Sequence, residues 1–321
     1  MEFTKMHGCG NDYVYINGFT QKVPQEEKPA LVHRLSDRHF GVGGDGVIFI
    51  NPSEIADFEM EMYNMDGSRG EMCGNGIRCV GKYVYDHGMT DRTQITVESC
   101  GQIKYLTLTV REDKVVTVRV NMGAPVLEAA QIPVSVQSDR EESGADRTRS
   151  GCGAGAEESG ACGIQSGCGG QSGAAESAEA VVNVPIEALG RQLRMTCVSM
   201  GNPHAVFFTD DVAGMDLTQI GPALECHPCF PNRTNVEFVR VIDRAHVEMR
   251  VWERGTGETL ACGTGCCATC VACVLNGLTD ERVSVKVLGG EITVEWDRET
   301  NLVYMTGPAE TVFDGVIDPV I

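Results

Sequence analysis

Two cysteines of this chain stand in the same short motif, one in each half of the sequence. Cys73 lies in Met-Cys-Gly-Asn-Gly (72–76), and Cys262 lies in Ala-Cys-Gly-Thr-Gly (261–265). A thiolate can remove a proton from a carbon, and a thiol can return one. Because a single residue cannot readily serve both sides of a carbon, the matched pair indicates inversion at a carbon centre.

Each motif is predicted to open a helix. A stretch without helix breakers follows each motif, at 77–87 and 266–276, and Gly277 comes after the second as a helix-terminating residue should. A helix N-terminus offers unpaired N–H groups and a partial positive charge, which lower a thiol pKa from about 8.5 into the range of about 3.5 to 7.5. The same groups can hold a carboxylate and stabilise a carbanion beside it. We therefore expect activated thiols next to an amino-acid carboxylate.

The repeat extends beyond the two motifs. At the offset 262 − 73 = 189, Glu59-Met60 falls on Glu248-Met249 and Phe49 on Phe238, without a gap. One copy alone would suit a small buried residue at a tight turn, but two copies in register favour function. A period this long indicates two similar domains rather than a solenoid.

Alternating apolar runs bounded by turn residues predict a strand-rich chain. With one principal helix per half, they indicate a mixed α/β (α+β) fold. The runs lie at 13–16, 47–50, 58–63, 105–110, 115–120, 236–241 and 283–287.

Composition limits the classes of function. The chain has 321 residues, 42% of them hydrophobic, which suits about two domains. A net charge of −19 argues against nucleic acid and anionic membranes as partners and favours a small-molecule ligand. No signal peptide or membrane span is evident, and fifteen cysteines, an odd number, favour reduced thiols. We expect a cytoplasmic protein.

Residues 138–180 differ from the rest of the chain. They are rich in Gly, Ser, Ala and Glu, with 8 acidic and 3 basic side chains, so this segment is predicted to be a disordered, solvated insertion. The spacings of Cys152, Cys162 and Cys168 within it are unlike those of zinc sites. Four further cysteines at 266, 267, 270 and 273 follow one helix and cannot converge on one ion, so we interpret them as packing residues and predict no metal site.

Polar residues gather at turns and strand ends in corresponding places of the two halves. Asn and Asp favour turns for local reasons, so each alone carries little weight. His204 and Glu253 differ, because an imidazole or carboxylate near a thiol tunes its ionisation. The set comprises Asn11, Asp12, Asn64, Asp66, Asn202, His204, Asn235, Glu253 and Arg254.

These residues fall in motifs that resemble those of the diaminopimelate epimerase family. The matching stretches lie at 5–12, 64–68, 72–76, 201–204, 233–237, 253–259 and 261–265, in the expected order. The resemblance implies cofactor-independent conversion of LL-2,6-diaminopimelate to the meso form, in lysine and peptidoglycan precursor synthesis. It also implies two pseudo-symmetric domains, each a β-barrel-like sheet around a central helix, with the site between them. We expect one domain at 1–121 plus about 308–321 and the other at 122–307.

The resemblance also assigns roles to individual residues. Cys73 and Cys262 would be the acid/base pair, with His204 and Glu253 modulating their pKa. The substrate contacts would be Asn11, Asn64, Gly74, Asn75, Asn202, Asn235, Glu253, Arg254, Gly263 and Thr264. No cofactor is implied, and relatives suggest a homodimer. One departure is Gly46, which stands where many relatives carry a substrate-contacting Gln.

Three alternatives remain open at this level. A proline or hydroxyproline racemase shares the two-cysteine architecture, although such relatives typically carry His in place of Asn75. A phenazine-type isomerase would lack the paired cysteines. A thiol-rich metal or redox protein without amino-acid turnover is the third.

Overall fold

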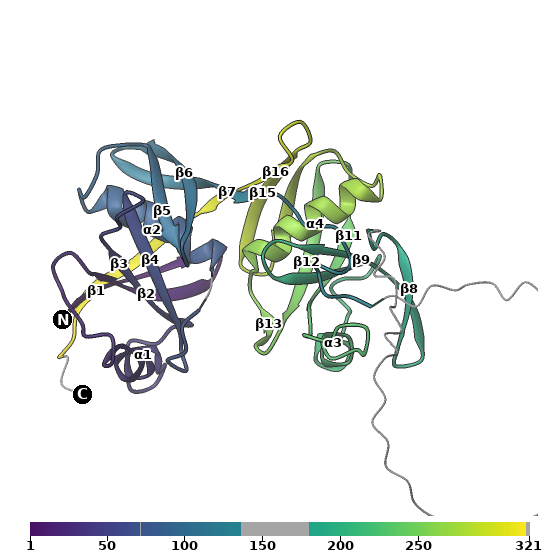
Figure 1. The fold of residues 1–321 in the computed structure, drawn as a ribbon, viewed down its shortest axis with the longest axis horizontal. Helices are drawn as coiled ribbons and strands as arrows, with labels where there is room; N and C mark the ends of the chain where they lie inside the picture. Colours follow the sequence, from purple (N-terminus) through teal and green to yellow (C-terminus); the bar gives the residue numbers. More distant parts are fainter. Residues whose placement is uncertain (71, 136–179, 319–321) are drawn as a thin grey trace, which may run out of the picture.

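The computed structural model describes residues 1–70, 72–135 and 180–318, and they form two lobes side by side (Figure 1). The first lobe contains most of the N-terminal half. Its elements are β1 (Glu2–Gly8), β2 (Asn11–Asn17), α1 (Lys28–Ser36), β3 (Gly46–Asn51), β4 (Phe58–Asn64), α2 (Gly74–Asp86), β5 (Gln94–Ser99), β6 (Gln102–Arg111) and β7 (Lys114–Gly123).

The second lobe repeats this order with two extra strands, β8 at its start and the short β13. Its elements are β8 (Val184–Ala188), β9 (Arg191–Ser199), β10 (Pro203–Phe208), α3 (Leu217–Glu225), β11 (Asn235–Val241), β12 (His246–Glu253), β13 (Gly257–Thr259), α4 (Gly263–Leu275), β14 (Arg282–Val287), β15 (Gly290–Asp297) and β16 (Leu302–Pro308). The chain then returns to the first lobe as β17 (Glu310–Val316).

The strand pairings of the two lobes match. The parallel pairs β2–β3 and β4–β5 of the first lobe correspond to β10–β11 and β12–β14 of the second. The helices keep the sequence offset, since 217 − 28 and 263 − 74 both equal 189. The predicted mixed α/β class and the predicted strands are confirmed. The two lobes have matching strand pairings and helix positions, in agreement with the repeat in the sequence.

Each lobe packs around its motif-bearing helix. In α2 every residue from Gly74 to Val84 is buried, and in α4 every residue from Gly263 to Cys273 is buried. Both helices contribute to one large hydrophobic cluster together with inward-facing strand residues such as Ile48. A helix that is buried all round belongs in the centre of a fold, so the sheets of each lobe surround their helix.

Both central helices end in the same way. Gly88 and Gly277, again 189 apart, have φ values of +69° and +68°. The next residue in each case donates its N–H to a carbonyl five residues back, from Met89 to Val84 and from Leu278 to Cys273. A left-handed glycine with this 6→1 bond closes an α-helix. The prediction that each motif opens a helix is confirmed, since α2 begins at Gly74 and α4 at Gly263, within the motifs themselves.

The sequence did not predict the outer helices α1 and α3, which cover the opposite faces of the same sheets. Leu31 and Leu35 of α1 pack on Val14 and Phe49, whereas Tyr15 and Ile48 of the same strands face α2. The helix α3 packs in the same manner on Phe207 and Phe238. Alternate residues of these strands therefore enter different cores, and the strands are buried on both sides.

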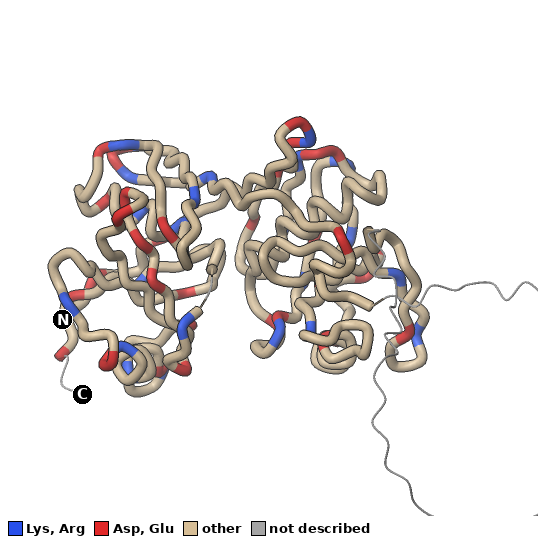
Figure 2. Tube along the Cα trace, viewed as in Figure 1, with Lys and Arg blue, Asp and Glu red and all other residues tan. Residues whose placement is uncertain are grey.

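The pairing of β7 with β16 of the second lobe connects the lobes. After β16 the chain crosses back, and β17 pairs with β1 within the first lobe. The predicted insertion lies outside the described residues except for Ala180, which forms an isolated bridge with Glu128. In the part of the chain that the structure describes, no helix is long and apolar enough to cross a membrane. Acidic and basic residues are interspersed over both lobes (Figure 2).

Candidate active site

The two motif cysteines occupy the same position and the same backbone conformation. Cys73 caps α2 with φ −117° and ψ 110°, and Cys262 caps α4 with φ −116° and ψ 113°. Each sulfur accepts a hydrogen bond from the N–H three residues on, at 3.2 Å from Gly76 and 3.4 Å from Gly265. The thiols therefore take the place that a Ser or Asp side chain usually holds at a helix start.

The two helix starts meet. A Cβ atom added to Gly74 would lie 3.5 Å from the Cα of Gly263, and one added to Gly263 would lie 3.3 Å from the Cα of Gly74. The Asn75 amide donates across the junction to the carbonyl of Ala261 at 3.0 Å. Glycine at both positions suits this close approach, and the N-termini of α2 and α4 meet at one place.

Cys73 lies against the start of β2. Its thiol donates to Oδ1 of Asn11 at 3.2 Å, and the Asn11 amide donates to Asp45 at 2.7 Å. Tyr13, a residue that the sequence analysis missed, hydrogen-bonds the same sulfur through its phenol. In the sequence, Tyr13 is one apolar residue of a predicted strand, and nothing there indicates contact with a cysteine.

Cys262 lies against the end of β12. Its thiol lies 3.5 Å from the hydroxyl of Thr264. The carboxyl of Glu253, which accepts from the hydroxyl of Thr259 at 2.5 Å, is close enough for its charge to raise the pKa of Cys262. The charge of Glu253 acts on Cys73 as well as on Cys262. One carboxyl group thus influences both sulfurs.

A buried pair of ionisable groups lies behind Cys262. His204 and Glu237 are fully buried, and the ring Nδ1 is 2.6 Å from Glu237 Oε1, while Nε2 is 3.0 Å from Asn202 Oδ1. The motifs in the sequence indicated roles for His204 and Asn202 but none for Glu237. A signal was present, because a carboxylate inside the apolar run 236–239 needs a buried partner.

The expected lowering of the thiol pKa values is wrong for this structure. Burial raises the pKa of Cys73, and it raises the pKa of Cys262 well above its ordinary value, with Glu253 and Glu237 adding to the effect at Cys262. The N–H groups of the helix starts act in the opposite direction but do not prevail. Removal from water destabilises the thiolate by more than the helix terminus stabilises it.

Three further predicted residues lie on the rim of this region. Asn235 is buried and satisfied by the backbone: its amide donates to Pro203 O at 2.9 Å, and its oxygen accepts from the N–H of Arg254 at 2.9 Å. The guanidinium of Arg254 is exposed and bonds Asn232 O at 3.1 Å. Asn64 donates to the hydroxyl of Ser68 at 3.1 Å.

Gly46 stands at the start of β3, where the backbone leaves no room for a side chain. A Cβ atom there would lie 2.0 Å from the carbonyl oxygen of Tyr63 and 3.1 Å from the ring of Tyr13. Gly46, which stands where the family resemblance implied a glutamine, therefore permits a close contact between strands in this chain.

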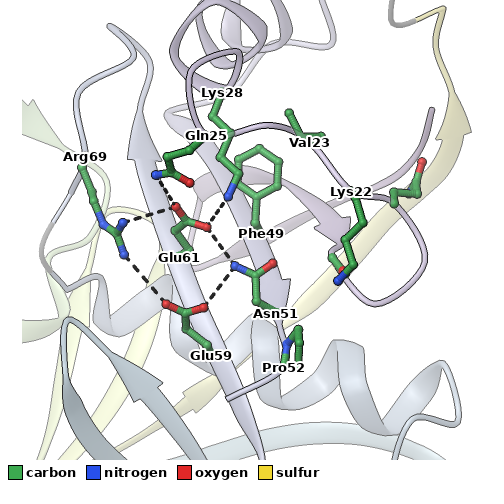
Figure 3. Close-up of a pocket in the computed structure, with 12 residues that line it drawn as sticks. Lys22, Val23, Gln25, Lys28, Phe49, Asn51, Pro52, Glu59, Glu61 and Arg69 are labelled. Carbon is green, nitrogen blue, oxygen red and sulfur yellow. Dashed lines mark hydrogen bonds and ion pairs between the residues drawn. The ribbon is translucent and has the colours of Figure 1, made fainter. Parts of the chain in front are cut away.

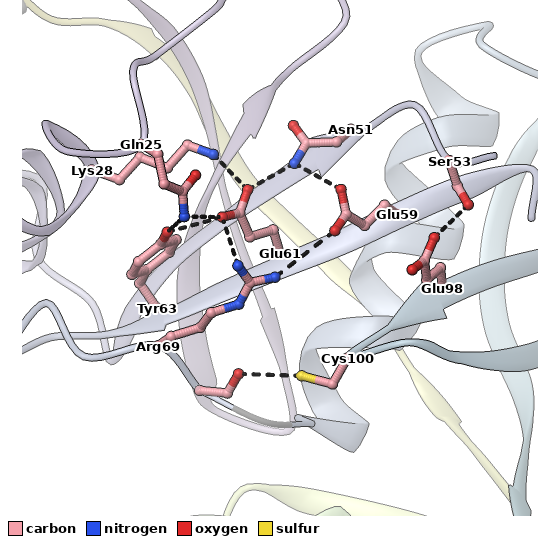
Figure 4. Close-up of polar contacts among 11 residues, drawn as sticks. Gln25, Lys28, Asn51, Ser53, Glu59, Glu61, Tyr63, Arg69, Glu98 and Cys100 are labelled. Carbon is pink, nitrogen blue, oxygen red and sulfur yellow. Dashed lines mark hydrogen bonds and ion pairs between the residues drawn. The ribbon is translucent and has the colours of Figure 1, made fainter. Parts of the chain in front are cut away.

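A polar network supports the segment that leads to Cys73. The buried carboxylate of Glu61 on β4 accepts from Lys28 on α1 at 2.5 Å and from Arg69 at 3.3 Å (Figure 3). It also accepts from Gln25 at 3.0 Å, and Arg69 reaches Glu59 at 3.9 Å (Figure 4). These groups line a pocket of about 390 Å³. The carboxylates of Glu61 and Glu59 are paired with donors inside the network. The network therefore holds α1, β4 and Arg69 together.

The cysteines that follow Cys262 are buried in the core. Cys266, Cys267, Cys270 and Cys273 are fully buried and belong to the hydrophobic cluster around both helices. Among the residues that the structure describes, no three His, Cys, Asp or Glu side chains are grouped to hold a metal ion.

Comparison with known proteins gives a consistent family match. The family model described as "Diaminopimelate epimerase" matches residues 3–128 and 196–312. A protein named diaminopimelate epimerase from Agathobacter rectalis is 52% identical over 319 residues, covering 99% of both chains. One of the same name from Acetivibrio thermocellus is 49% identical, again covering 99% of both.

Solved structures share the fold at low sequence identity. A phenazine biosynthesis protein of the PhzF family from Bacillus anthracis matches with a TM-score of 0.63 at 16% identity, covering 99% of both chains. A probable proline racemase from Agrobacterium radiobacter K84 matches with a TM-score of 0.61 at 14% identity, covering 99% of this chain and 92% of that one. These two correspond to alternatives raised by the sequence, and their likeness is confined to the fold. The sequence match decides among them: this chain belongs to the diaminopimelate epimerase family.

Proposed function

We propose that this chain is an isomerase that converts LL-2,6-diaminopimelate to meso-diaminopimelate without a cofactor. The relatives that are 52% and 49% identical carry the name of this activity. The observation that carries the mechanism is the pair of thiols at two abutting helix starts. The product would serve lysine and peptidoglycan precursor synthesis.

Cys73 and Cys262 are the proposed acid/base pair. One sulfur, as the thiolate, takes the proton from the reacting Cα, and the other, as the thiol, delivers a proton to the opposite face. Both thiols are predominantly protonated at neutral pH in this structure, because burial holds each pKa above its ordinary value. A thiolate therefore needs a nearby proton acceptor, and Glu253 is close enough to act electrostatically on both Cys262 and Cys73.

The helix starts are the proposed site for the reacting carboxylate. The first N–H groups of each helix, at Gly74 and Asn75 and at Gly263 and Thr264, have no carbonyl partner within the helix. They can stabilise the negative charge that spreads onto the carboxylate when the proton leaves.

The remaining predicted residues would hold the rest of the substrate and set the thiols. Arg254 has the planar fork that suits the distal carboxylate, and Asn11, Asn64, Asn202 and Asn235 are the proposed amide contacts. Because the Asn235 amide is already satisfied by the backbone, its contribution would come through the position of Arg254. His204 would modulate the sulfurs through Glu237.

We also propose that the lobes are two domains, 1–121 plus about 308–321 and 122–307, and that the chain acts as a cytoplasmic homodimer. The return of β17 to pair with β1 supports the first boundary. No disulfide joins any two cysteines within the described ranges, as expected in a reducing compartment. A partner copy could cover the exposed apolar side chains of β17, Val312, Phe313 and Val316.

The test is incubation of the reduced protein with LL-diaminopimelate in D2O without added cofactor. We expect the meso isomer to appear with deuterium at the inverted Cα. Inertness towards this substrate, in a preparation whose thiols titrate as free, would contradict the proposal; turnover of proline or hydroxyproline instead would favour the racemase alternative.

A further inference from the structure

Arg78 is a fully buried arginine whose hydrogen-bond partners are all neutral. Its exposed fraction is 0%. The other buried cations, Lys5, Lys28 and Lys82, each pair with a carboxylate. The contacts of Arg78 are Pro308 O at 3.1 Å, Gly74 O at 3.2 Å, Met305 Sδ at 3.5 Å and Cys9 Sγ at 3.9 Å. A buried charge without a counter-charge is costly, so its position calls for a functional explanation.

The contact with Gly74 connects Arg78 to the site. The Gly74 carbonyl and the Asn75 N–H belong to one trans peptide and therefore point in opposite directions. The guanidinium donates to the carbonyl end at 3.2 Å. The N–H end belongs to the first turn of α2, where the sulfur of Cys73 accepts from Gly76 N at 3.2 Å, and it helps to lower the pKa of that thiol. A charged donor on the oxygen polarises the peptide and makes its N–H a stronger donor. Arg78 thus acts on Cys73 through one peptide group.

The second half of the chain has no such group. At the offset of 189, the counterpart of Arg78 is Cys267, a buried neutral thiol. A second matched position differs in charge too: a Cβ atom on Gly76 would lie 2.7 Å from the side chain of Ile48, and one on Gly265 would lie 2.7 Å from the carboxylate of Glu237. The surroundings of Cys73, the Cys73 half-site, therefore contain one additional cation, Arg78. The surroundings of Cys262 contain one additional anion, Glu237.

We propose that Arg78 is a positioning residue for the Cys73 half-site: through the Gly74 carbonyl it orients and polarises the peptide whose N–H supports a thiolate at Cys73. Because the helix start at Cys262 has no such cation behind it, the two pseudo-equivalent thiols are unequal, and Cys73 is the first to ionise. The inference rests on the proposed function for its meaning in turnover, but its physical content concerns thiol ionisation and can be measured without turnover.

The other groups around each thiol are the background for this effect. Tyr13 of β2 and Glu253 of β12 face Cys73, and Glu253 together with Glu237 of β11 faces Cys262. Both carboxylates oppose ionisation at Cys262, whereas only Glu253 is a main contributor at Cys73. Their influence is the same in wild type and in a variant at position 78, so a comparison isolates the arginine.

The test measures the pH dependence of iodoacetamide alkylation at each cysteine by peptide mass spectrometry, in wild type, Arg78→Met and Arg78→Lys. We expect Arg78→Met to raise the midpoint for Cys73 by about one pH unit, the scale of one charge-assisted hydrogen bond, and to shift Cys262 less. Arg78→Lys should restore part of the difference. Lys82→Met, one turn further along α2, is the matched control, expected to lose stability without moving the Cys73 midpoint.

Equal shifts at both cysteines, or an unchanged Cys73 midpoint in the folded Arg78→Met protein, would overturn the proposal. If Arg78→Met does not fold, Arg78→Lys decides: a shift confined to Cys73 supports the role, and no shift or a common shift refutes it. Wild-type turnover of LL-diaminopimelate is measured on the same preparation. Its absence would contradict the proposed function while the alkylation comparison still decides the role of Arg78.

Discussion

At the scale of single residues, the site depends on two thiols that the fold shields from water, with Cys262 buried and Cys73 partly buried. Sequence motifs identified Cys73 and Cys262 but predicted the wrong direction for their pKa, because burial in a folded core cannot be read from a local helix start. Tyr13, Arg78 and Glu237 escaped the sequence analysis for a related reason. Tyr13 and Glu237 become important through residues distant in sequence, and Arg78 becomes important through its complete burial, which the motif does not reveal.

Glu253 provides a prediction at this scale. Burial raises its pKa above the ordinary value, and only the ionised carboxylate can accept a thiol proton. We therefore expect kcat/KM to fall as pH decreases through this raised pKa. Glu253→Gln should lose that acid limb and about 10²-fold to 10⁴-fold in kcat, the usual contribution of a positioned acid or base.

The control is Glu258→Gln, which removes a nearby carboxylate that pairs with Arg250 instead. Its pH–rate profile should keep the wild-type acid limb. An unchanged acid limb in Glu253→Gln would show that another group accepts the proton.

At the scale of elements, the helix starts must touch for the two thiols to share one substrate. An added methyl group at Gly74 would lie 3.0 Å from Met305 and 3.5 Å from Gly263. Gly74→Ala should therefore crowd Met305 at the junction of the helix starts, shift the Cys73 end of α2 slightly and lower kcat/KM by about 10-fold to 100-fold, since small displacements of catalytic groups cost this much. Steady-state kinetics would show the loss.

Gly81→Ala on the same helix separates activity from stability. Its methyl group would meet the flexible ends of Leu108 and Leu106, away from the helix starts. We expect a change in melting temperature with kcat/KM retained. Wild-type activity in Gly74→Ala would mean that the close approach is not required.

The Glu61 network makes a prediction about stability. Its donors, Lys28 foremost, lower the pKa of Glu61 from 4.5 to about 2 despite burial. A carboxyl group with a lowered folded-state pKa stabilises fully above its unfolded value, and this contribution is lost as pH falls from about 4.5 towards 2. Glu61→Gln leaves Lys28 buried without a counter-charge, so it should cost on the order of 3 kcal/mol at neutral pH.

Urea unfolding at a series of pH values measures this contribution. Below pH 4.5 the free energy of unfolding should fall less steeply in Glu61→Gln than in wild type. Glu54→Gln, at an exposed acid of the same lobe, should follow wild type. Parallel curves for wild type and Glu61→Gln would contradict the role of the network.

The sequence predicted the central elements better than the outer ones. The central helices α2 and α4 follow motifs with clear starts and left-handed glycines at their ends, and the strands alternate. The nine-residue helices α1 and α3 carry weaker signals: α3 contains Pro222, and the Glu27 cap of α1 makes no side-chain hydrogen bond. Their stability comes from packing on strands that are buried on both faces, a tertiary effect.

At the scale of the whole molecule, the chain returns to its first lobe and leaves an apolar edge. Among the described strands, β17 pairs with β1, and Val312 and Val316 are 53% and 78% exposed. Unpaired edges of this kind favour association. We expect light scattering to give the mass of a dimer, about twice the 34.6 kDa of one chain.

The variant that tests this surface is Val312→Asp/Val316→Asp, which should weaken the dimer. Ile242→Asp, at an exposed apolar residue of the second lobe, is the control and should leave the mass unchanged. A monomeric wild-type protein at micromolar concentration would refute the proposed dimer, and a dimeric double variant would place the interface elsewhere.

The central claim is that the two halves each contribute one thiol to a single two-base reaction. The most direct measurement is epimerisation of LL-diaminopimelate by wild type, Cys73→Ala and Cys262→Ala, with Cys79→Ala as a control that removes a buried thiol of the same helix. The account predicts that each of the first two variants loses at least about 10³-fold in kcat, while a folded Cys79→Ala keeps activity close to wild type. Near-wild-type epimerisation by either Cys73→Ala or Cys262→Ala would contradict it.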